Sequence, residues 1–178
     1  MLESIVDYQN GIVFITGPTG SGKSTTIASL IDKICSKYAK HIVTIEDPIE
    51  FIYSNKKSIV SQRQLGVDTA SFSEGIKYAL RQDPDVIFIG EIRDRDTLEA
   101  ALKASETGHL VLTTLHTNDA VQTINRIISM FDIANRDNIR KQLAETLRAT
   151  VAQKLVYSEK LKMRVPIYEI LIATSTIK

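Results

Sequence analysis

Residues 17–24 read GPTGSGKS and match the pattern G-x-x-x-x-G-K-[ST] at each fixed position. An apolar run precedes the motif, and a segment with helical spacing follows it. Glycines let such a loop curl so that successive backbone N–H groups point at phosphate oxygens, and the positive end of the following helix adds to that field. Lys23 is placed to reach the β- and γ-phosphates, and the Ser24 hydroxyl to bind Mg²⁺. The motif therefore predicts a strand, a loop and a helix that bind a nucleoside triphosphate through Gly17, Pro18, Thr19, Gly20, Ser21, Gly22, Lys23 and Ser24.

Length and composition indicate one soluble globular domain. The chain has 178 residues, of which 43% are hydrophobic and 24% are charged, and its formal net charge is +1. Cys35 is the single cysteine, which excludes an intrachain disulfide and a four-cysteine zinc site. No apolar run approaches the ~18 residues of a membrane span, and residues 1–10 carry acids where a signal peptide would be basic. We expect a cytoplasmic protein.

Short runs rich in Val and Ile recur along the chain and suit strands that are buried on both faces. They lie at residues 11–16, 41–46, 85–90 and 110–115. Segments with apolar residues at helical spacing separate them. Strand and helix in alternation indicate an α/β fold with a mostly parallel sheet flanked by helices.

The second half of the chain is expected to begin with helices. Apolar spacing predicts one amphipathic helix from Val121 to Phe131 and a longer one from Ile139 to Val151, so that residues 120–160 form a helical subregion. Residues 165–173 are interpreted as an added strand, with Pro166 at an edge or start position. Residues 54–71, rich in Ser, Lys, Gln and Gly, are interpreted as a long surface loop that could hold a short hairpin.

Acidic residues follow two of the predicted strands, at the sheet edge where open α/β folds bind ligands. Glu91 comes directly after Gly90, and it is the candidate base that orients or deprotonates an attacking water. Many nucleotide-hydrolysing enzymes of this kind have Asp where this chain has Gly90. Mg²⁺ would then depend more on Ser24, phosphate oxygens and water. Glu46 and Glu50 could hold Mg²⁺-bound water or orient the ribose.

His116 ends the fourth predicted strand, in the stretch TTLHT. An imidazole at that position could sense the γ-phosphate.

Four stretches, taken in order, resemble one family closely. GPTGSGKSTT, TIEDPIEF, ALRQDPDVIFIGEIRD and TGHLVLTTLHTNDA are similar to the Walker A, Asp box, Walker B and His box of the secretion ATPases that power type II secretion and type IV pili. The resemblance runs from about Ile12 to Ala173. Within that superfamily the chain resembles most the pilus-retraction, or twitching-motility, ATPases. Residues 61–72 (SQRQLGVDTASF) support this likeness.

The resemblance implies a RecA-like domain that works in a hexameric ring, hydrolyses ATP with Mg²⁺ and acts on an inner-membrane platform protein of the pilus machinery. Location at the inner face of the cytoplasmic membrane is implied as well. Residues Gly17 to Thr25 would hold the phosphates, Glu46 and Glu50 belong to the Asp box, and Glu91 and His116 are the catalytic glutamate and the His-box histidine. Ser24 and Glu46 would hold Mg²⁺, and the candidate arginines for the γ-phosphate are Arg63, Arg81 and Arg93.

Two departures from the family pattern matter. Assembly and type II secretion ATPases commonly carry a four-cysteine zinc element, which a chain with Cys35 alone cannot form, so we expect retraction rather than extension or secretion. Family members also have a PAS-like domain before the ATPase core, and here 16 residues precede Gly17. We therefore expect that residues 1–178 are the RecA-like core without that domain, as a fragment or a shortened form.

Four other functions are compared with this one. A GTPase would carry N-K-x-D, whereas Asn55-Lys56 is followed by Lys57 and Ser58. A RecA-like DNA motor would suit the basic residues 121–178, but an aromatic content of 6% with no Trp gives few surfaces for stacking bases, so nucleic acid is not the expected partner. A nucleotide-binding assembly module with little turnover, as well as an assembly or type II secretion ATPase, stays open as an alternative.

Overall fold

The computed structural model describes residues 2–174, and it alternates strands with helices as the sequence predicts. In chain order the elements are η1 (Leu2–Asp7), β1 (Gly11–Thr16), α1 (Lys23–Lys37), β2 (His41–Glu46), β3 (Ile59–Gln64), α2 (Phe72–Ala79), η2 (Leu80–Gln82), β4 (Val86–Ile89), α3 (Arg95–Glu106), β5 (Leu110–Leu115), α4 (Ala120–Ser129), η3 (Ile133–Asn135), α5 (Arg136–Thr146), β6 (Leu147–Ser158) and β7 (Met163–Ile172).

The strands form one seven-stranded sheet in the order β3-β2-β4-β5-β1-β6-β7. Each neighbouring pair is parallel except β6 and β7, which are antiparallel. The four strands predicted from apolar runs are β1, β2, β4 and β5, and they occupy the middle of the sheet. Because they are parallel, their carboxyl ends meet at one edge, where the phosphate loop also lies.

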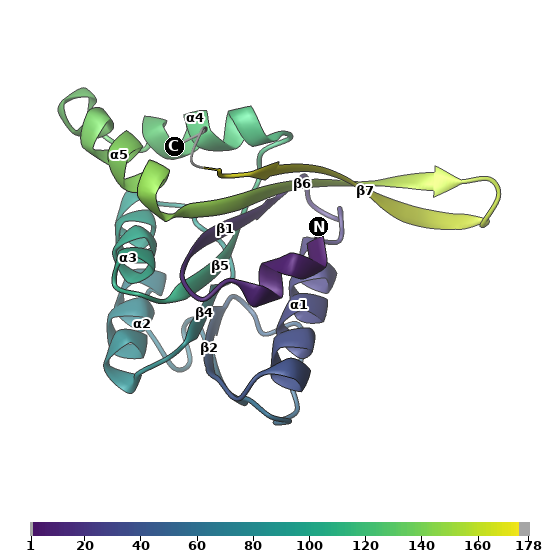
Figure 1. Cartoon of the computed structure of the whole chain (residues 1–178), viewed down its shortest axis with the longest axis horizontal. Coiled ribbons are helices and arrows are strands. Elements are labelled where there is room, and N and C mark those ends of the chain that lie inside the picture. The colour runs from purple at the N-terminus through teal and green to yellow at the C-terminus, as the bar shows by residue number, and fades with distance from the viewer. Residues whose placement is uncertain (1, 175–178) are drawn as a thin grey trace.

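Helices cover both faces of the sheet, and the two cores follow the alternation of side chains along each strand (Figure 1). On one face, Val13 and Ile15 of β1 pack with the apolar side of α1 and with η1. On the other face, Ile12 and Phe14 pack with residues of α2, α3 and α5. The sheet is thus buried on both sides, as its continuous apolar runs require.

The long helix expected from Ile139 to Val151, and with it the helical subregion expected to residue 160, is wrong beyond Thr146. The helix α5 ends at Thr146, and β6 begins at Leu147 and pairs in parallel with β1. Leu147 and Val151 are four residues apart, so they would share a face of a helix. In β6 the register shifts after Leu147, and Leu147 packs in one core while Val151 packs in the other. Thr150 and Val151 are β-branched and fully buried beside β1, and this packing favours the strand.

The expected surface loop over residues 54–71 contains no hairpin within the described chain but the parallel edge strand β3. β3 pairs with β2 from His41↔Ile59 to Glu46↔Gln64. Its residues are half-buried and mostly polar, because an edge strand has a neighbour on one side only, and this composition made it look like a loop.

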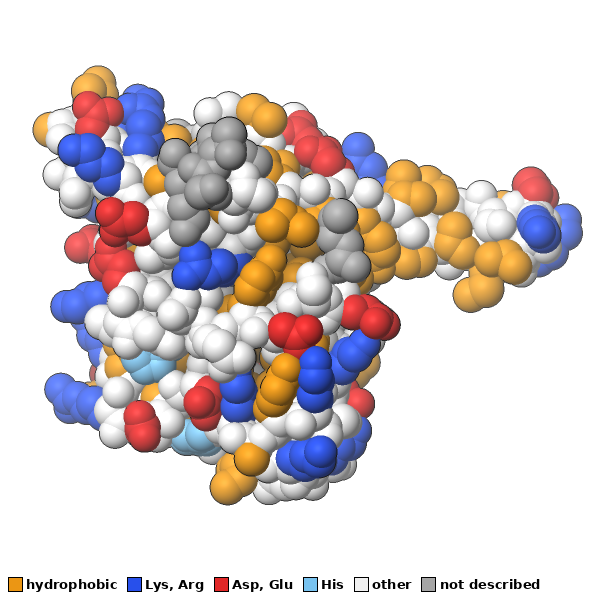
Figure 2. All heavy atoms as spheres, in the orientation of Figure 1, with side chains coloured by type: hydrophobic (Ala, Val, Ile, Leu, Met, Phe, Trp, Pro, Cys, Tyr) orange, Lys and Arg blue, Asp and Glu red, His pale blue; other side chains and the backbone are white. Residues whose placement is uncertain are grey.

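The added C-terminal strand is confirmed as β7, which lies at the sheet edge as Pro166 requires. Together, β6 and β7 form a hairpin that extends well beyond the body of the molecule (Figure 1). Figure 2 shows apolar side chains along this hairpin and charged ones at its tip. Its exposed apolar residues are Val156, Tyr157, Leu161, Met163, Ile167 and Tyr168.

Candidate nucleotide site

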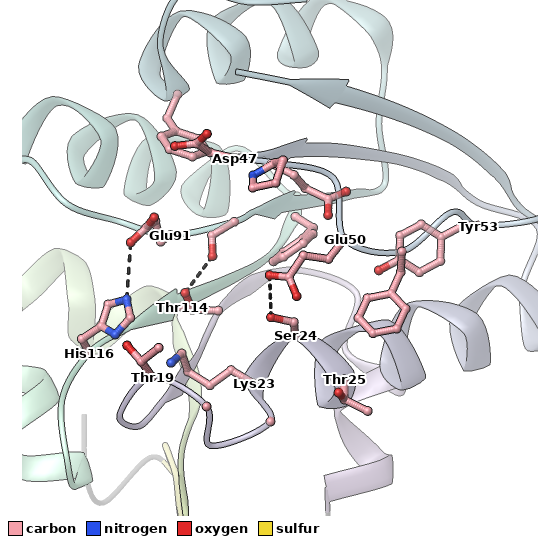
Figure 3. Close-up of a pocket in the computed structure, with 18 of the residues that line it drawn as sticks. Thr19, Lys23, Ser24, Thr25, Asp47, Glu50, Tyr53, Glu91, Thr114 and His116 are labelled. Carbon is pink, nitrogen blue, oxygen red and sulfur yellow. Dashed lines mark hydrogen bonds and ion pairs between the residues drawn. The ribbon is translucent and has the colours of Figure 1, made fainter. Parts of the chain in front are cut away.

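A cavity of about 450 Å³ lies at the carboxyl edge of the sheet, between the phosphate loop and the segments that follow β2, β4 and β5. Figure 3 shows the loop with Lys23 and Ser24 on one side, and Glu91, Asp47 and Glu50 facing it. The topology produces this meeting, since β1, β2, β4 and β5 run parallel and their last residues share an edge. The phosphate loop, both acidic segments and His116 therefore line one site, as the sequence predicts.

Lys23 points back into the loop. Its Nζ donates hydrogen bonds to the backbone carbonyls of Gly17 at 2.9 Å and Pro18 at 3.1 Å. Burial lowers the pKa of this lysine, while the carboxylates of Glu91 and Glu50 act in the opposite direction. The ammonium group is thus held inside the curl of the loop, where phosphate oxygens would replace the two carbonyls.

The two glutamates of the Asp box have different surroundings. Ser24 Oγ donates to Glu50 Oε1 at 3.0 Å, which places a hydroxyl and a carboxylate side by side at the start of α1 (Figure 3). Glu46 is buried and accepts from Thr44 Oγ1 at 2.6 Å and from Gln62 Nε2 at 3.1 Å. Of the pair expected to hold Mg²⁺, Ser24 therefore has Glu50 rather than Glu46 beside it.

Glu91 lies between two cationic or potentially cationic groups. Its Oε2 is 3.4 Å from His116 Nε2, and its Oε1 forms an ion pair with Arg93. The Glu91 side chain is 15% exposed, whereas the side chains of His116 and Arg93 are more than half exposed. Arg93 also lies 3.7 Å from Asp47, and its contact with Glu91 raises the Arg93 pKa. The candidate base and the candidate His-box histidine are thus in contact.

Of the three candidate arginines, the structure brings Arg93 alone to this site. Arg81 lies in η2, before the start of β4, and stacks on the Tyr78 ring at 5.8 Å. That position is the amino edge of the sheet, opposite the phosphate loop. Arg63 lies on the edge strand β3 beside Ile45. Among residues 2–174, no arginine lines the cavity itself.

Several lining residues were missed by the sequence analysis. Phe51, Tyr53 and Leu155 line the cavity, and burial raises the pKa of Tyr53. Thr114 Oγ1 donates to the Gly90 carbonyl at 2.7 Å and ties the ends of β4 and β5 together. Thr114 had a local signal, its place next to the end of an apolar run. Leu155 had none, because it comes from the hairpin, far along the chain.

The oxygen groups near Ser24 fit Mg²⁺, which prefers hard oxygen ligands and usually keeps water and substrate phosphates around it. The described residues contain no group of three or more His, Cys, Asp or Glu side chains able to hold a metal ion by themselves. Mg²⁺ would therefore need phosphate oxygens in addition to the protein.

Within residues 2–174, no helix has the length and apolar character that a membrane crossing needs.

Comparisons with known proteins agree with this geometry. Residues 1–172 match the family model described as "Type II/IV secretion system protein". The chain is 46% identical over 178 residues to the "Twitching motility protein" of Neisseria gonorrhoeae, covering 100% of this chain and 48% of the relative. It is 45% identical to the "Type IV pilus retractation ATPase PilT" of Pseudomonas aeruginosa, covering 100% of this chain and 52% of the relative.

Among solved structures, the chain matches the pilus retraction motor PilT with bound ADP at a TM-score of 0.95 and 49% identity, covering 99% of this chain and 51% of that one. The expected RecA-like fold is therefore confirmed, and so is the resemblance to pilus-retraction ATPases. The chain spans about half the length of the curated relatives it matches. The chain belongs to the type II/IV secretion system protein family.

Proposed function

We propose that this chain is the ATP-binding and ATP-hydrolysing core of a type IV pilus retraction motor. The observation that carries the proposal is the convergence of three groups on one cavity: the phosphate loop with Lys23, the Ser24–Glu50 pair, and Glu91 beside His116. Binding groups and a candidate base thus face each other across a space of about 450 Å³.

The residues have separable roles in hydrolysis. Backbone N–H groups of the loop and Lys23 Nζ hold the β- and γ-phosphates and stabilise the charge that builds up on them. Glu91 orients a water molecule and accepts its proton as the water oxygen bonds to the γ-phosphorus and the bond to the β–γ bridging oxygen breaks. His116 holds Glu91 in place and contacts the γ-phosphate side of the cavity. Ser24 and Glu50 would hold Mg²⁺, which would supply positive charge against the phosphates. Buried Glu46 supports the segment that carries Glu50.

The larger assembly is part of the proposal. We extend the proposal to a hexamer that acts at the inner face of the cytoplasmic membrane on a platform protein of the pilus machinery. The names of two relatives, a twitching motility protein and a pilus retractation ATPase, support the link to the pilus. Residues 1–178 correspond to the ATPase core of these longer relatives. The PAS-like domain of the family is expected outside the 178 residues.

An assembly or secretion ATPase is the second candidate. The chain is 44% identical over 131 residues to a type II secretion system protein E of Pseudomonas aeruginosa. The single Cys35 favours retraction, because the four-cysteine zinc element common in the other two classes cannot form.

Turnover is tested by phosphate release from ATP with Mg²⁺. We expect activity in the wild-type chain and none above background in Lys23→Ala, while Lys57→Ala, an exposed lysine away from the loop, keeps wild-type activity. Nucleotide binding without any turnover in the wild type would instead support an assembly module.

The direction of the motor is tested with a chimera that joins the preceding part of the Pseudomonas aeruginosa retraction ATPase to this chain. In a strain that lacks its own retraction ATPase, we expect the chimera to restore twitching. Restoration of pilus assembly in a strain without its assembly ATPase would contradict the retraction role.

A further inference from the structure

Gln153 links the phosphate loop to the protruding hairpin. It follows directly on the last residue of β6 that pairs with β1, Ala152, and it pairs with Tyr168 of β7. It is therefore the point at which the hairpin leaves the sheet. Its side chain is 2% exposed although it carries an amide, so both ends of that amide need partners.

Both partners belong to the nucleotide-binding segment. Gln153 Nε2 donates to the backbone carbonyl of Ser21 at 2.6 Å, inside the phosphate loop. Thr26 Oγ1, in the first turn of α1, donates to Gln153 Oε1 at 2.7 Å. One side chain thus fixes the loop and the helix that follows it to the same strand.

Two glycines of the loop lie directly against the same residue. A Cβ at Gly17 would lie 2.3 Å from the Gln153 backbone oxygen, and a Cβ at Gly22 would lie 2.8 Å from Gln153 Nε2. Both glycines also have positive φ, 145° and 88°. The first and last glycines of the motif are therefore required twice, by backbone conformation and by the close approach of β6.

We propose that Gln153 is a positioning residue that holds the phosphate loop in its binding shape against the root of the β6–β7 hairpin, so that nucleotide binding and hairpin order are coupled. The inference rests on the proposed function, because it concerns the same nucleotide. The ladder between β6 and β7 continues without a break from Ala149↔Ile172 to Ser158↔Met163, so a change at Gln153 is transmitted along a continuous element.

The test compares variants that remove the two hydrogen bonds with variants that keep them. Gln153→Met keeps the length of the side chain and removes both bonds. Thr26→Val removes one bond from the other side, and Thr26→Ser retains the hydroxyl. Lys154→Gln, at the next, exposed position of β6, is the matched control. Thermal unfolding shows whether each variant folds. If Gln153→Met does not fold, the comparison of Thr26→Val with Thr26→Ser still tests the proposal.

The first readout is the affinity for a fluorescent ADP analogue, with a steady-state assay beside it. Loss of a buried hydrogen bond that leaves its partner unpaired corresponds to about a tenfold effect. We expect Gln153→Met and Thr26→Val to weaken binding by about tenfold and to raise KM more than they lower kcat. Thr26→Ser and Lys154→Gln should bind like the wild type. A purely structural defect would instead lower the folded fraction without changing KM.

The second readout is amide hydrogen exchange of residues 154–167. In the wild type, we expect the nucleotide to slow exchange in the loop and in the hairpin. In Gln153→Met at saturating nucleotide, it should slow exchange in the loop only. Wild-type affinity in Gln153→Met and Thr26→Val, or equal hairpin protection in wild type and Gln153→Met, would overturn the inference alone. A wild-type chain that binds no nucleotide would overturn the proposed function as well.

Discussion

Lys23 combines burial with positive charge, and its partners explain how the chain tolerates that combination. The Gly17 and Pro18 carbonyls accept from its Nζ, so the ammonium is solvated by the loop itself. Lys23→Ala should abolish nucleotide binding and leave the fold intact, because what is removed is a contact to phosphate and not part of the apolar core. Titration with a fluorescent ATP analogue measures binding, and circular dichroism reports the fold. Wild-type affinity in the variant would refute the assignment of the phosphate loop.

Glu91 is the carboxylate whose position suits a base, since it faces the loop and contacts His116. Glu91→Gln preserves size and hydrogen bonding but removes the base. We expect ATP affinity to be kept and the rate of hydrolysis to fall by about 10²- to 10⁴-fold. Glu46→Gln is the comparison, because Glu46 already accepts from Thr44 and Gln62. If Glu46→Gln loses hydrolysis and Glu91→Gln keeps it, the wrong glutamate has been assigned.

Glu50 is expected to affect the requirement for Mg²⁺, because its carboxylate lies 3.0 Å from Ser24 Oγ. In Glu50→Gln the carboxylate charge is lost, so a higher Mg²⁺ concentration should be needed for half-maximal hydrolysis. Glu46→Gln should leave that concentration unchanged. The measurement is the rate of phosphate release at increasing Mg²⁺ concentration. Addition of EDTA gives the rate without Mg²⁺. A shift in Glu46→Gln alone would restore the original pairing of Ser24 with Glu46.

At the scale of elements, the sequence predicts what is decided locally. The central strands β1 and β5 are buried throughout and mostly apolar because helices cover both faces, and this makes them recognisable. Whether β3 and β6 form strands depends on the strands that they pair with, and not on their own sequence alone. β3 is polar because it is an edge strand, and the apolar spacing at the start of β6 fits a helix and a strand equally well.

The candidate site likewise has residues that a local motif predicts and residues that only distant contacts bring there. The phosphate loop is a continuous motif, and its residues follow from the sequence directly. Gln153 is 127 residues from Thr26 along the chain, so no local pattern could place it there. The choice between Glu46 and Glu50 depends in part on Gln62, whose hydrogen bond to Glu46 exists only once β2 and β3 are paired.

The junction of α5 with β6 packs against the start of β1, and this contact gives an element-scale prediction. Gly11 has a φ of 98°, and a Cβ there would lie 2.5 Å from the Thr146 carbonyl oxygen. Gly108 has a φ of 101° with open space around it. Gly108→Ala should therefore lower the free energy of unfolding by about 1–2 kcal/mol from backbone strain. Gly11→Ala should lower it by about 1–3 kcal/mol more, because the strand must also shift.

Urea unfolding of both variants measures the difference. Equal destabilisation of Gly11→Ala and Gly108→Ala would mean that the α5–β6 junction does not clash with a Cβ at position 11.

At the scale of the whole molecule, the cavity is lined by the phosphate loop, by carboxylates and by an imidazole. Among the described residues, Lys23 is the one Lys or Arg side chain that lines it. Within the described part of the chain no arginine lines the cavity, and Arg93 beside it is already paired with Glu91 and Asp47. Hydrolysis by P-loop enzymes without an arginine on the γ-phosphate is slower by a factor of about 10³ to 10⁵. We therefore expect the further positive charge to come from outside this copy of the chain.

This arrangement predicts how turnover depends on concentration. In dilute solution the 178-residue chain should hydrolyse ATP slowly although Lys23, Glu91 and His116 are present. If a neighbouring copy supplies the arginine, through its Arg63 or Arg81, turnover per chain should rise with protein concentration as copies associate. Sedimentation alongside the turnover assay measures both quantities, and Arg63→Ala and Arg81→Ala show which arginine acts. A stable hexamer with rapid, concentration-independent hydrolysis in both variants would show that the core needs no outside arginine.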